Sequence, residues 1–120
     1  MPLFAQIVIA LLALIHVYIF WMESFSWERS GPKAFSTLPR DLFPKTKAMA
    51  QNQGVYNGFL AAGLVWSLLI SDPTWAVNVA LFFLACIAVA GVVGALTVDR
   101  KIALIQTVPA LVGVGSLLVG

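Results

Sequence analysis

The chain contains, near its start, a long apolar stretch from about Leu3 to Phe25, LFAQIVIALLALIHVYIFWMESF. A transmembrane helix needs roughly 20 mostly apolar residues, because each residue rises about 1.5 Å and the hydrocarbon layer is about 30 Å thick. Three further apolar runs follow, at about Val55 to Ile70, Trp75 to Val98 and Ile102 to Val119. The pattern therefore predicts four membrane-spanning helices.

The composition agrees with a membrane protein. Of the 120 residues, 61% are hydrophobic and 10% are charged, and the mean hydropathy is +0.97. Soluble domains have about 25% charged residues. The four runs leave no room for a soluble domain, so we expect one transmembrane domain over residues 1–120. The first run is too long for a signal peptide and lacks its basic segment and small-residue cleavage site, so we interpret it as a retained helix.

The basic residues are confined to two of the three connectors between the runs. The first and third connectors hold all seven, which are Arg29, Lys33, Arg40, Lys45, Lys47, Arg100 and Lys101. The second connector, residues 71–74, holds none. If all four runs span, the first and third connectors share one face. The positive-inside rule makes that face cytoplasmic and places both termini outside.

These observations predict an all-α, polytopic membrane fold, a four-helix antiparallel bundle with both termini outside. We expect spans over about residues 3–27, 49–70, 73–98 and 100–119, with a cytoplasmic loop over residues 28–48. The net charge of +2 comes from the cytoplasmic connectors. The expected partners are therefore membrane lipids with anionic headgroups, and not nucleic acid.

Local signals refine the helix ends. Asp72 followed by Pro73 is typical of an N-cap and a first-turn proline, here for the third helix. Asp99 is placed to cap the fourth helix. Pro109 is expected to loosen the fourth helix, because it leaves the carbonyl of Ile105 without its usual donor.

Aromatic residues are placed to anchor the bundle at both membrane surfaces. Trp21 and Trp27 are expected at the cytoplasmic interface, and Trp66 and Trp75 near the outer one. The long first loop also holds apolar residues among its charges, which either lie at the membrane surface or fold back over the bundle as a short lid. These are Leu38, Leu42 and Phe43.

Small residues recur at helical spacing and permit close backbone approach, which matters where association cannot rely on apolar burial. They are Gly54, Gly58 and Ala62 on the second helix, Ala90 with Gly94 and Gly91 with Ala95 on the third, and Gly113, Gly115 and Ser116 on the fourth. The sequence leaves open whether these stripes pair within a chain or between chains. A homo-oligomer, either a dimer or a trimer, is compatible with them.

Polar side chains gather in the cytoplasmic half of the expected bundle. His16 and Glu23 are nearly two turns apart, so they point the same way about 10 Å apart along the helix. The other polar residues at this depth are Asn52, Gln53, Tyr56, Asn57 and Gln106. An ionisable group at mid-bilayer costs about 2.5–3.5 kcal/mol, so such groups should face partners inside the bundle. We therefore expect a pocket open to the cytoplasm, with His16 and Glu23 as catalytic or orienting groups and the other five as substrate-binding groups.

Each of these residues also has a structural interpretation. Glu23 is near enough to the surface to pair with Arg29 or a loop lysine, and His16 fits a histidine bonded to an amide of the second helix. Amides on transmembrane helices often only join helices, worth about 0.6 kcal/mol each. One His with one Glu is too few for a metal site, and Cys86 has no metal-ligand spacing. No metal or organic cofactor is expected.

Three stretches resemble a family of small bacterial membrane proteins, domain-of-unknown-function family 1304. They are His16–Val17–Tyr18–Ile19, Glu23–Ser24–Phe25–Ser26–Trp27 and the run from Asn52 to Leu64, NQGVYNGFLAAGL. The family pattern is matched here by His16, Glu23, Asn52, Gln53, Gly54, Tyr56 and Asn57. The resemblance covers the chain from end to end and implies a class of protein without a reaction.

A weaker architectural similarity is to the membrane-associated eicosanoid and glutathione enzyme superfamily. Those enzymes also have four helices, a long first cytoplasmic loop and outside termini. The chain lacks their Asn-x-x-Glu motif, because Val55 follows Asn52 at that spacing. This resemblance leaves open a similar trimer but gives no support to glutathione chemistry.

Three functions fit the sequence. The first is a membrane enzyme or binding protein for a lipophilic or amphipathic small molecule, with its site in the cytoplasm-facing pocket. The second is a small proton-coupled oligomeric transporter that uses Glu23, and the third is a structural or assembly protein. The polar residues are concentrated in the cytoplasmic half of the bundle. This favours the enzyme or binding protein over the transporter, because the binding site of a transporter usually lies near the midplane.

Overall fold

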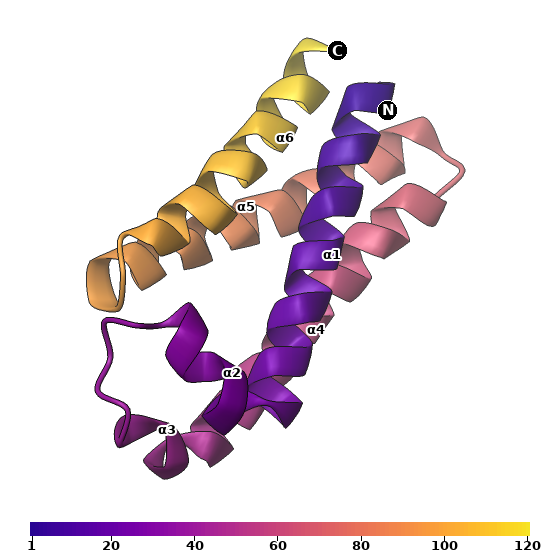
Figure 1. Ribbon diagram of the computed structural model, residues 1–120. Helices are drawn as coiled ribbons and strands as arrows, with labels where there is room; N and C mark the ends of the chain where they lie inside the picture. The colour runs from indigo at the N-terminus through magenta and orange to yellow at the C-terminus, as the bar shows by residue number, and fades with distance from the viewer.

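The computed structural model describes residues 1–120, and every regular element in it is a helix (Figure 1). The all-helical prediction is thus confirmed. The long helices are α1 (Leu3–Phe25), α4 (Lys47–Leu69) and α5 (Pro73–Thr97). The last part of the chain forms a π-helical turn, η1 (Ala103–Thr107), which continues as α6 (Val108–Val119). Two short helices, α2 (Trp27–Ala34) and α3 (Leu42–Lys45), lie in the connector between α1 and α4.

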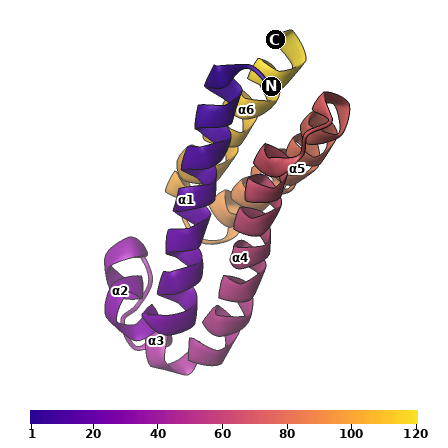
Figure 2. The same ribbon diagram turned by 90° about the vertical axis from the view of Figure 1, so that its right-hand side faces the viewer.

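The long helices form a ring of neighbours. α1 packs most extensively against α4, α4 packs against α5, α5 against η1 and α6, and α6 against α1. α1 and α4 run side by side along the molecule, and the hairpin of α5 and α6 is inclined to them (Figures 1 and 2). Both chain ends lie together at one end, where Gly120 packs against Pro2.

The chain direction alternates from helix to helix, so the first and third connectors lie toward the end of the molecule opposite the termini. We call this the basic end, because these connectors hold all seven Lys and Arg residues. The hydrophobic core lies toward the termini. Its members are Ala5, Ile9, Leu12 and Ala13 of α1, Leu64 of α4, Ala80, Leu84 and Ile87 of α5, and Ala110 and Leu117 of α6.

The predicted helix caps are present. Oδ1 of Asp72 accepts hydrogen bonds from the backbone N–H groups of Thr74 and Trp75, at 2.9 and 3.3 Å, and Pro73 occupies the first turn of α5. Oδ1 of Asp99 accepts from the N–H of Lys101 at 3.0 Å, which closes the turn before η1. Both caps satisfy N–H groups that have no partner inside their helix.

The first helix is shorter than predicted. α1 ends at Phe25 rather than at Trp27, because the backbone of Ser26 leaves the helical region, with φ −140° and ψ 26°. The chain turns there and starts α2 at Trp27. Trp27 is therefore not a simple interfacial anchor, because it packs inside the loop that the sequence predicted to begin at Glu28.

α2 and α3 form a small packed unit, here called the cap. The ring of Trp27 lies 4.9 Å from that of Phe43, centroid to centroid, and its Nε1–H donates to Oγ1 of Thr46 at 2.9 Å. Phe43 is 1% exposed and also packs against Gly31, where a side chain would not fit. The cap contacts the ends of α1 and α4. The predicted loop thus folds back on the protein, although Leu42 stays exposed.

The fourth apolar run is not one regular α-helix. The backbone N–H of Val108 donates to the carbonyl of Ala103, five residues earlier, which is the π-helical pattern. Pro109 follows directly and has no N–H of its own, so it cannot complete a regular ladder. The fourth helix is thus loosened before Pro109, as the sequence predicted. The wider turn buries Gln106 against the bundle.

The small residues pair helices within the chain. Gly54 and Gly58 of α4 lie against Ser24 and Phe20 of α1. Gly91 of α5 lies against η1, where Oγ1 of Thr107 donates to the carbonyl of Ala88 at 2.9 Å. These glycines bring the backbones of neighbouring helices close together, as the helical spacing indicated.

Candidate functional site

His16 is completely buried on α1, and both of its ring nitrogens have partners. Nδ1 lies 2.8 Å from the carbonyl oxygen of Leu12, and Nε2 lies 3.0 Å from the side-chain nitrogen of Gln106. A carbonyl oxygen only accepts and an amide nitrogen only donates, so one neutral tautomer satisfies both contacts. Nδ1–H donates to Leu12, and Nε2 accepts from Gln106. This arrangement joins α1 to η1 and leaves no ring nitrogen free.

Glu23 is paired with a different helix. Nδ2 of Asn57 donates to Oε1 of Glu23 at 2.7 Å and also contacts the backbone carbonyl of Gln53 at 3.2 Å. α1 and α4 approach closely at this level because Gly54 of α4 leaves room for Ser24. The pair therefore fixes one oxygen of the Glu23 carboxyl group and leaves the other without a protein partner among the hydrogen bonds of the fold.

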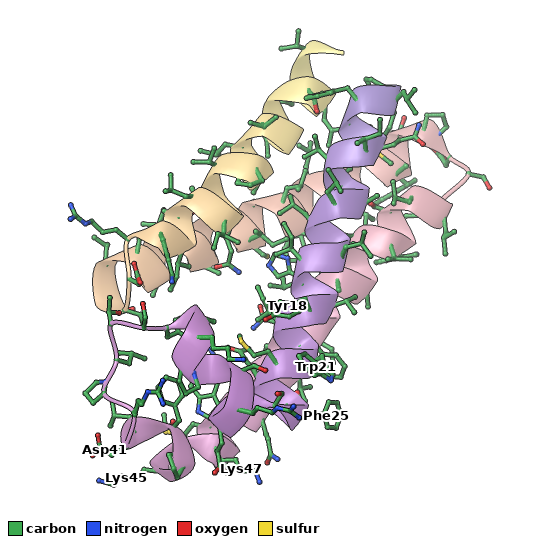
Figure 3. The ribbon with its side chains drawn as sticks, viewed as in Figure 1. Tyr18, Trp21, Phe25, Asp41, Lys45 and Lys47 are labelled. Carbon is green, nitrogen blue, oxygen red and sulfur yellow. The ribbon has the colours of Figure 1, made fainter.

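A pocket of about 240 Å³ lies beside Glu23, where α1 ends and α2 begins. We call it the corner pocket. It is lined by Trp21, Glu23, Ser24, Phe25, Ser26, Trp27, Glu28, Arg29 and Lys47. Three elements contribute to it, because the break at Ser26 turns α2 back toward the first residue of α4. Figure 3 shows Trp21 and Phe25 on the lower part of α1 and Lys47 at the basic end.

The charges of the corner pocket balance. Two carboxyl groups, Glu23 and Glu28, face two cationic side chains, Arg29 and Lys47. Nζ of Lys47 lies 3.6 Å from Oε1 of Glu28. Both members of this pair are about half exposed, so the pair contributes little to stability. Oγ of Ser24 is buried at the pocket wall and has no hydrogen-bond partner in the protein.

An apolar groove of about 660 Å³ runs between α1 and α4. It is lined by Val17, Phe20, Val55, Gly58, Phe59, Ala61, Ala62, Val65, Trp66 and Leu69. Gly58 and Ala62 carry little or no side chain, which makes the groove hollow. The groove contains no charged group, in contrast to the corner pocket.

Four of the seven residues predicted as one site form two separate pairs. His16 pairs with Gln106 and lines neither the corner pocket nor the apolar groove, whereas Glu23 pairs with Asn57 and lines the pocket. The expectation that His16 and Glu23 share a cavity is wrong, because η1 buries His16. The structural interpretation expected an amide of the second helix to bond to His16, and this is also wrong in its partner, because the amide belongs to Gln106 of η1. The remaining predicted residues, Asn52, Gln53 and Tyr56, are exposed on α4.

Several pocket residues were not singled out from the sequence as site residues. The sequence predicts Arg29 and Lys47 only as basic residues of the cytoplasmic connector and as candidate partners of Glu23. It gives Glu28 only as the start of that connector, and Trp21 as an interfacial anchor. The signal that joins them is the helix break at Ser26, which hydrophobicity does not reveal. No group of three or more His, Cys, Asp or Glu residues is placed to hold a metal ion, and Cys86 is half-buried and unpaired.

Comparison with known proteins gives a family but no activity. The family described as "Protein of unknown function (DUF1304)" matches residues 10–118. The uncharacterized protein YpaA of Lactococcus lactis subsp. lactis is 25% identical over 108 residues, which cover 88% of this chain and 89% of YpaA. No solved structure matches the chain. The similarity to membrane-associated eicosanoid and glutathione enzymes is therefore not supported.

Proposed function

Because this chain belongs to the DUF1304 family, whose activity is unknown, we propose its function from the site: it is a four-span membrane protein that binds an amphipathic small molecule in the corner pocket. The family resemblance expected from the sequence is confirmed, and it carries no reaction. The proposal therefore depends on the exposed surface of the helices and on the chemistry of the pocket.

The exposed apolar surface supports a location in a membrane. α1 and α5 are long and apolar enough to span, yet only 28% and 22% of their most apolar windows are buried in the fold. The core helix of a soluble protein would be mostly buried. Side chains such as Phe82, Leu96 and Leu118 are 63%, 82% and 69% exposed. Soluble monomers rarely expose contiguous apolar surface on this scale.

The other two spans of the proposal are α4 and the η1–α6 unit. α4 has the same length as α1 but opens with polar residues at the basic end, and Ala103–Val119 is a shorter apolar segment. With all four spanning, the basic end faces the cytoplasm of a bacterial inner membrane and both termini lie outside. The corner pocket then opens at the inner headgroup layer.

The observation that carries the proposal is the corner pocket itself. It combines balanced charges with three aromatic side chains, Trp21, Phe25 and Trp27, at the boundary between the basic end and the apolar helices. Amphipathic molecules have the same division into polar and apolar parts. Pockets for small molecules combine apolar walls with placed polar groups. Here three aromatic residues form the apolar wall, and the other six of the nine lining residues are polar or charged.

The test compares Glu23→Gln with Asp41→Asn. Glu23→Gln removes the carboxylate but keeps the oxygen that accepts from Asn57. Asp41→Asn makes the same chemical change at an exposed residue outside the pocket. Each protein is purified in mild detergent, and bound small molecules are extracted and identified by mass spectrometry. We expect the wild type and Asp41→Asn to retain the same amphipathic molecule, and Glu23→Gln to lose most of it. Equal retention by all three proteins would refute the proposal.

A structural function is the second candidate, and the His16–Gln106 pair favours it. The pair is buried, both ring nitrogens of His16 have partners, and neither residue lines the corner pocket or the apolar groove, as expected for a contact that only joins α1 to η1. We therefore assign no proton transfer to His16. If the Glu23 test fails, this structural interpretation extends to Glu23 and Asn57 as well.

A further inference from the structure

We infer, on the basis of the proposed function, that the ligand is a phospholipid with a zwitterionic headgroup. One acyl chain lies in the apolar groove between α1 and α4, and the headgroup lies in the corner pocket. Three observations carry this inference: the continuity of the two cavities, the length of the groove and the charges of the pocket.

The groove and the pocket lie end to end on one side of the α1–α4 pair. On α1, Val17 and Phe20 line the groove, and Trp21 and Ser24, each four residues further on, line the pocket. Residues four apart lie one above the other on the same helix face. A molecule that fills the groove therefore reaches the pocket by continuing along α1 by one turn.

The groove is long enough for an acyl chain. Its lining on α4 extends from Val55 to Leu69, a rise of about 21 Å at 1.5 Å per residue. One leaflet of a bilayer contributes about 15 Å of hydrocarbon, half of the ~30 Å total. A chain anchored at the inner headgroup layer thus finds apolar wall along its whole length, with Gly58 and Ala62 leaving space for it.

The pocket charges fit a headgroup that carries both signs. Lys47 and Glu28 already neutralise one another at 3.6 Å. This leaves the free oxygen of Glu23 for a cationic ammonium group and Arg29 for a phosphate, the anion that its planar guanidinium binds best. The exposed ring of Trp21, which lines the pocket, adds an aromatic surface of the kind that attracts cations. A purely anionic headgroup could pair its phosphate with Arg29 but would bring no cation to the Glu23 carboxyl group.

The headgroup experiment measures lipid selectivity. The wild type, Glu23→Gln and Asp41→Asn are reconstituted in vesicles with equal amounts of phosphatidylethanolamine and phosphatidylglycerol of identical acyl chains. Native mass spectrometry then counts the lipids that stay bound after mild detergent extraction. We expect an excess of phosphatidylethanolamine of about threefold or more on the wild type and on Asp41→Asn, and no excess on Glu23→Gln. Equal binding or an excess of phosphatidylglycerol on the wild type would overturn the inference.

The groove experiment uses a matched pair of substitutions. Ala62→Phe fills the groove, and Ala90→Phe adds the same ring to an exposed position of α5 outside it. Both residues are exposed, so neither change disturbs the core. We expect Ala62→Phe to reduce the retained lipid by about fivefold or more, because the new ring takes apolar contact area from the chain, and Ala90→Phe to have no effect. Equal retention by the two variants would contradict an acyl chain in the groove.

The two experiments separate the inference from the proposed function. Two results refute the inference and leave the proposed function standing. The wild type carries a molecule that depends on Glu23 and is not a phospholipid, or it carries a phospholipid that depends on Glu23 but shows no headgroup preference. A wild type that retains nothing sensitive to Glu23→Gln refutes both.

Discussion

At the scale of single residues, the contact between His16 and Gln106 joins two buried polar side chains from different helices. The two residues are 90 positions apart in the sequence, and the contact joins α1 to η1. Both side chains are polar in a region that the proposal places inside a membrane. Each of the two buried side chains therefore depends on the other for a hydrogen-bond partner.

We predict that Gln106→Ala lowers the free energy of unfolding by about 1–2 kcal/mol, because it leaves Nε2 of His16 buried without a donor. The measurement is thermal or denaturant unfolding in detergent micelles. Gln6→Ala is the control, because Gln6 is exposed and bonds only to the nearby backbone of Met1. A loss of stability no larger than that of the control would contradict a stabilising pair.

A double-mutant cycle isolates the same interaction. If His16 and Gln106 act only through each other, His16→Ala combined with Gln106→Ala costs less than the sum of the two single changes. The expected coupling is about 0.5–1.5 kcal/mol, the range of hydrogen bonds between transmembrane helices. Additive effects would show that the two residues stabilise the fold independently.

The residues that could be predicted from sequence are those whose partners are local. The N-cap of α5 at Asp72 could be predicted because its donors are only two and three residues away. The partner of His16, Gln106, could not be predicted, because the contact depends on how η1 packs and on the extra residue in its π-helical turn before Pro109. The sequence therefore indicated four polar residues that make contacts between helices, His16, Glu23, Asn57 and Gln106, but it grouped them with three exposed residues into one site instead of two pairs.

At the scale of helices, the glycines of α5 decide how closely it approaches η1. A side chain at Gly91 would overlap Thr107, with its Cβ only 2.8 Å from the backbone nitrogen of Thr107. Backbone cannot move aside as a flexible side chain can. The interface between α5 and η1 therefore has no room for a side chain at Gly91.

We predict that Gly91→Ala destabilises the protein by about 1–3 kcal/mol, the usual cost of overpacking. Gly115→Ala is the matched control, because nothing lies within 4 Å of a Cβ at Gly115. There alanine is expected to be neutral or to stabilise the helix by up to about 1 kcal/mol. Both variants are compared by unfolding in the same detergent, and equal effects would show that α5 and η1 do not meet at Gly91.

The cap gives a second prediction for an element. Phe43→Ala removes the ring that packs against Trp27 and Gly31, at a local cost of about 3–5 kcal/mol. The cap then opens more often while the four long helices stay folded. We expect tryptic cleavage after the exposed Arg40 to accelerate by about tenfold or more, because cleavage follows the population of the open form. Leu42→Ala, at a 38% exposed neighbour, should change the rate little.

The cap also marks the limit of what hydrophobicity predicts about elements. The charges and prolines of residues 28–48 indicated a loop, and the fold-back was one of two open alternatives. The structure contains the two short helices α2 and α3 in this region because the rings of Trp27 and Phe43 pack against each other. The long helices were predictable because their apolar runs are continuous, whereas short elements depend on a few specific contacts.

At the scale of the whole molecule, α4 is the span whose membrane crossing most needs testing. Its polar opening sets it apart from α1 and α5. Ser36 lies in the cap connector and Ser71 in the turn after α4, so the two residues bracket this helix, and both are exposed. If α4 crosses, they lie on opposite sides of the membrane.

We predict opposite accessibility for cysteines at these positions in a Cys86→Ala background. In intact cells, a membrane-impermeant thiol reagent should label Ser71→Cys from outside, and Ser36→Cys only after the membrane is permeabilised. The fraction labelled is read from a gel shift. Labelling of both cysteines from the same side would show that α4 does not span and would remove the four-span part of the proposal.

The contact between Pro2 and Gly120 has a practical consequence for chain connectivity. A linker of a few residues should suffice to make a circularly permuted protein, since termini this close can be joined without stretching the fold. New ends opened beside Ser36 would then emerge at the basic end, while every helix keeps its original direction. With the basic end at the inner membrane surface, as proposed, reporter domains fused there would lie at the inner headgroup layer.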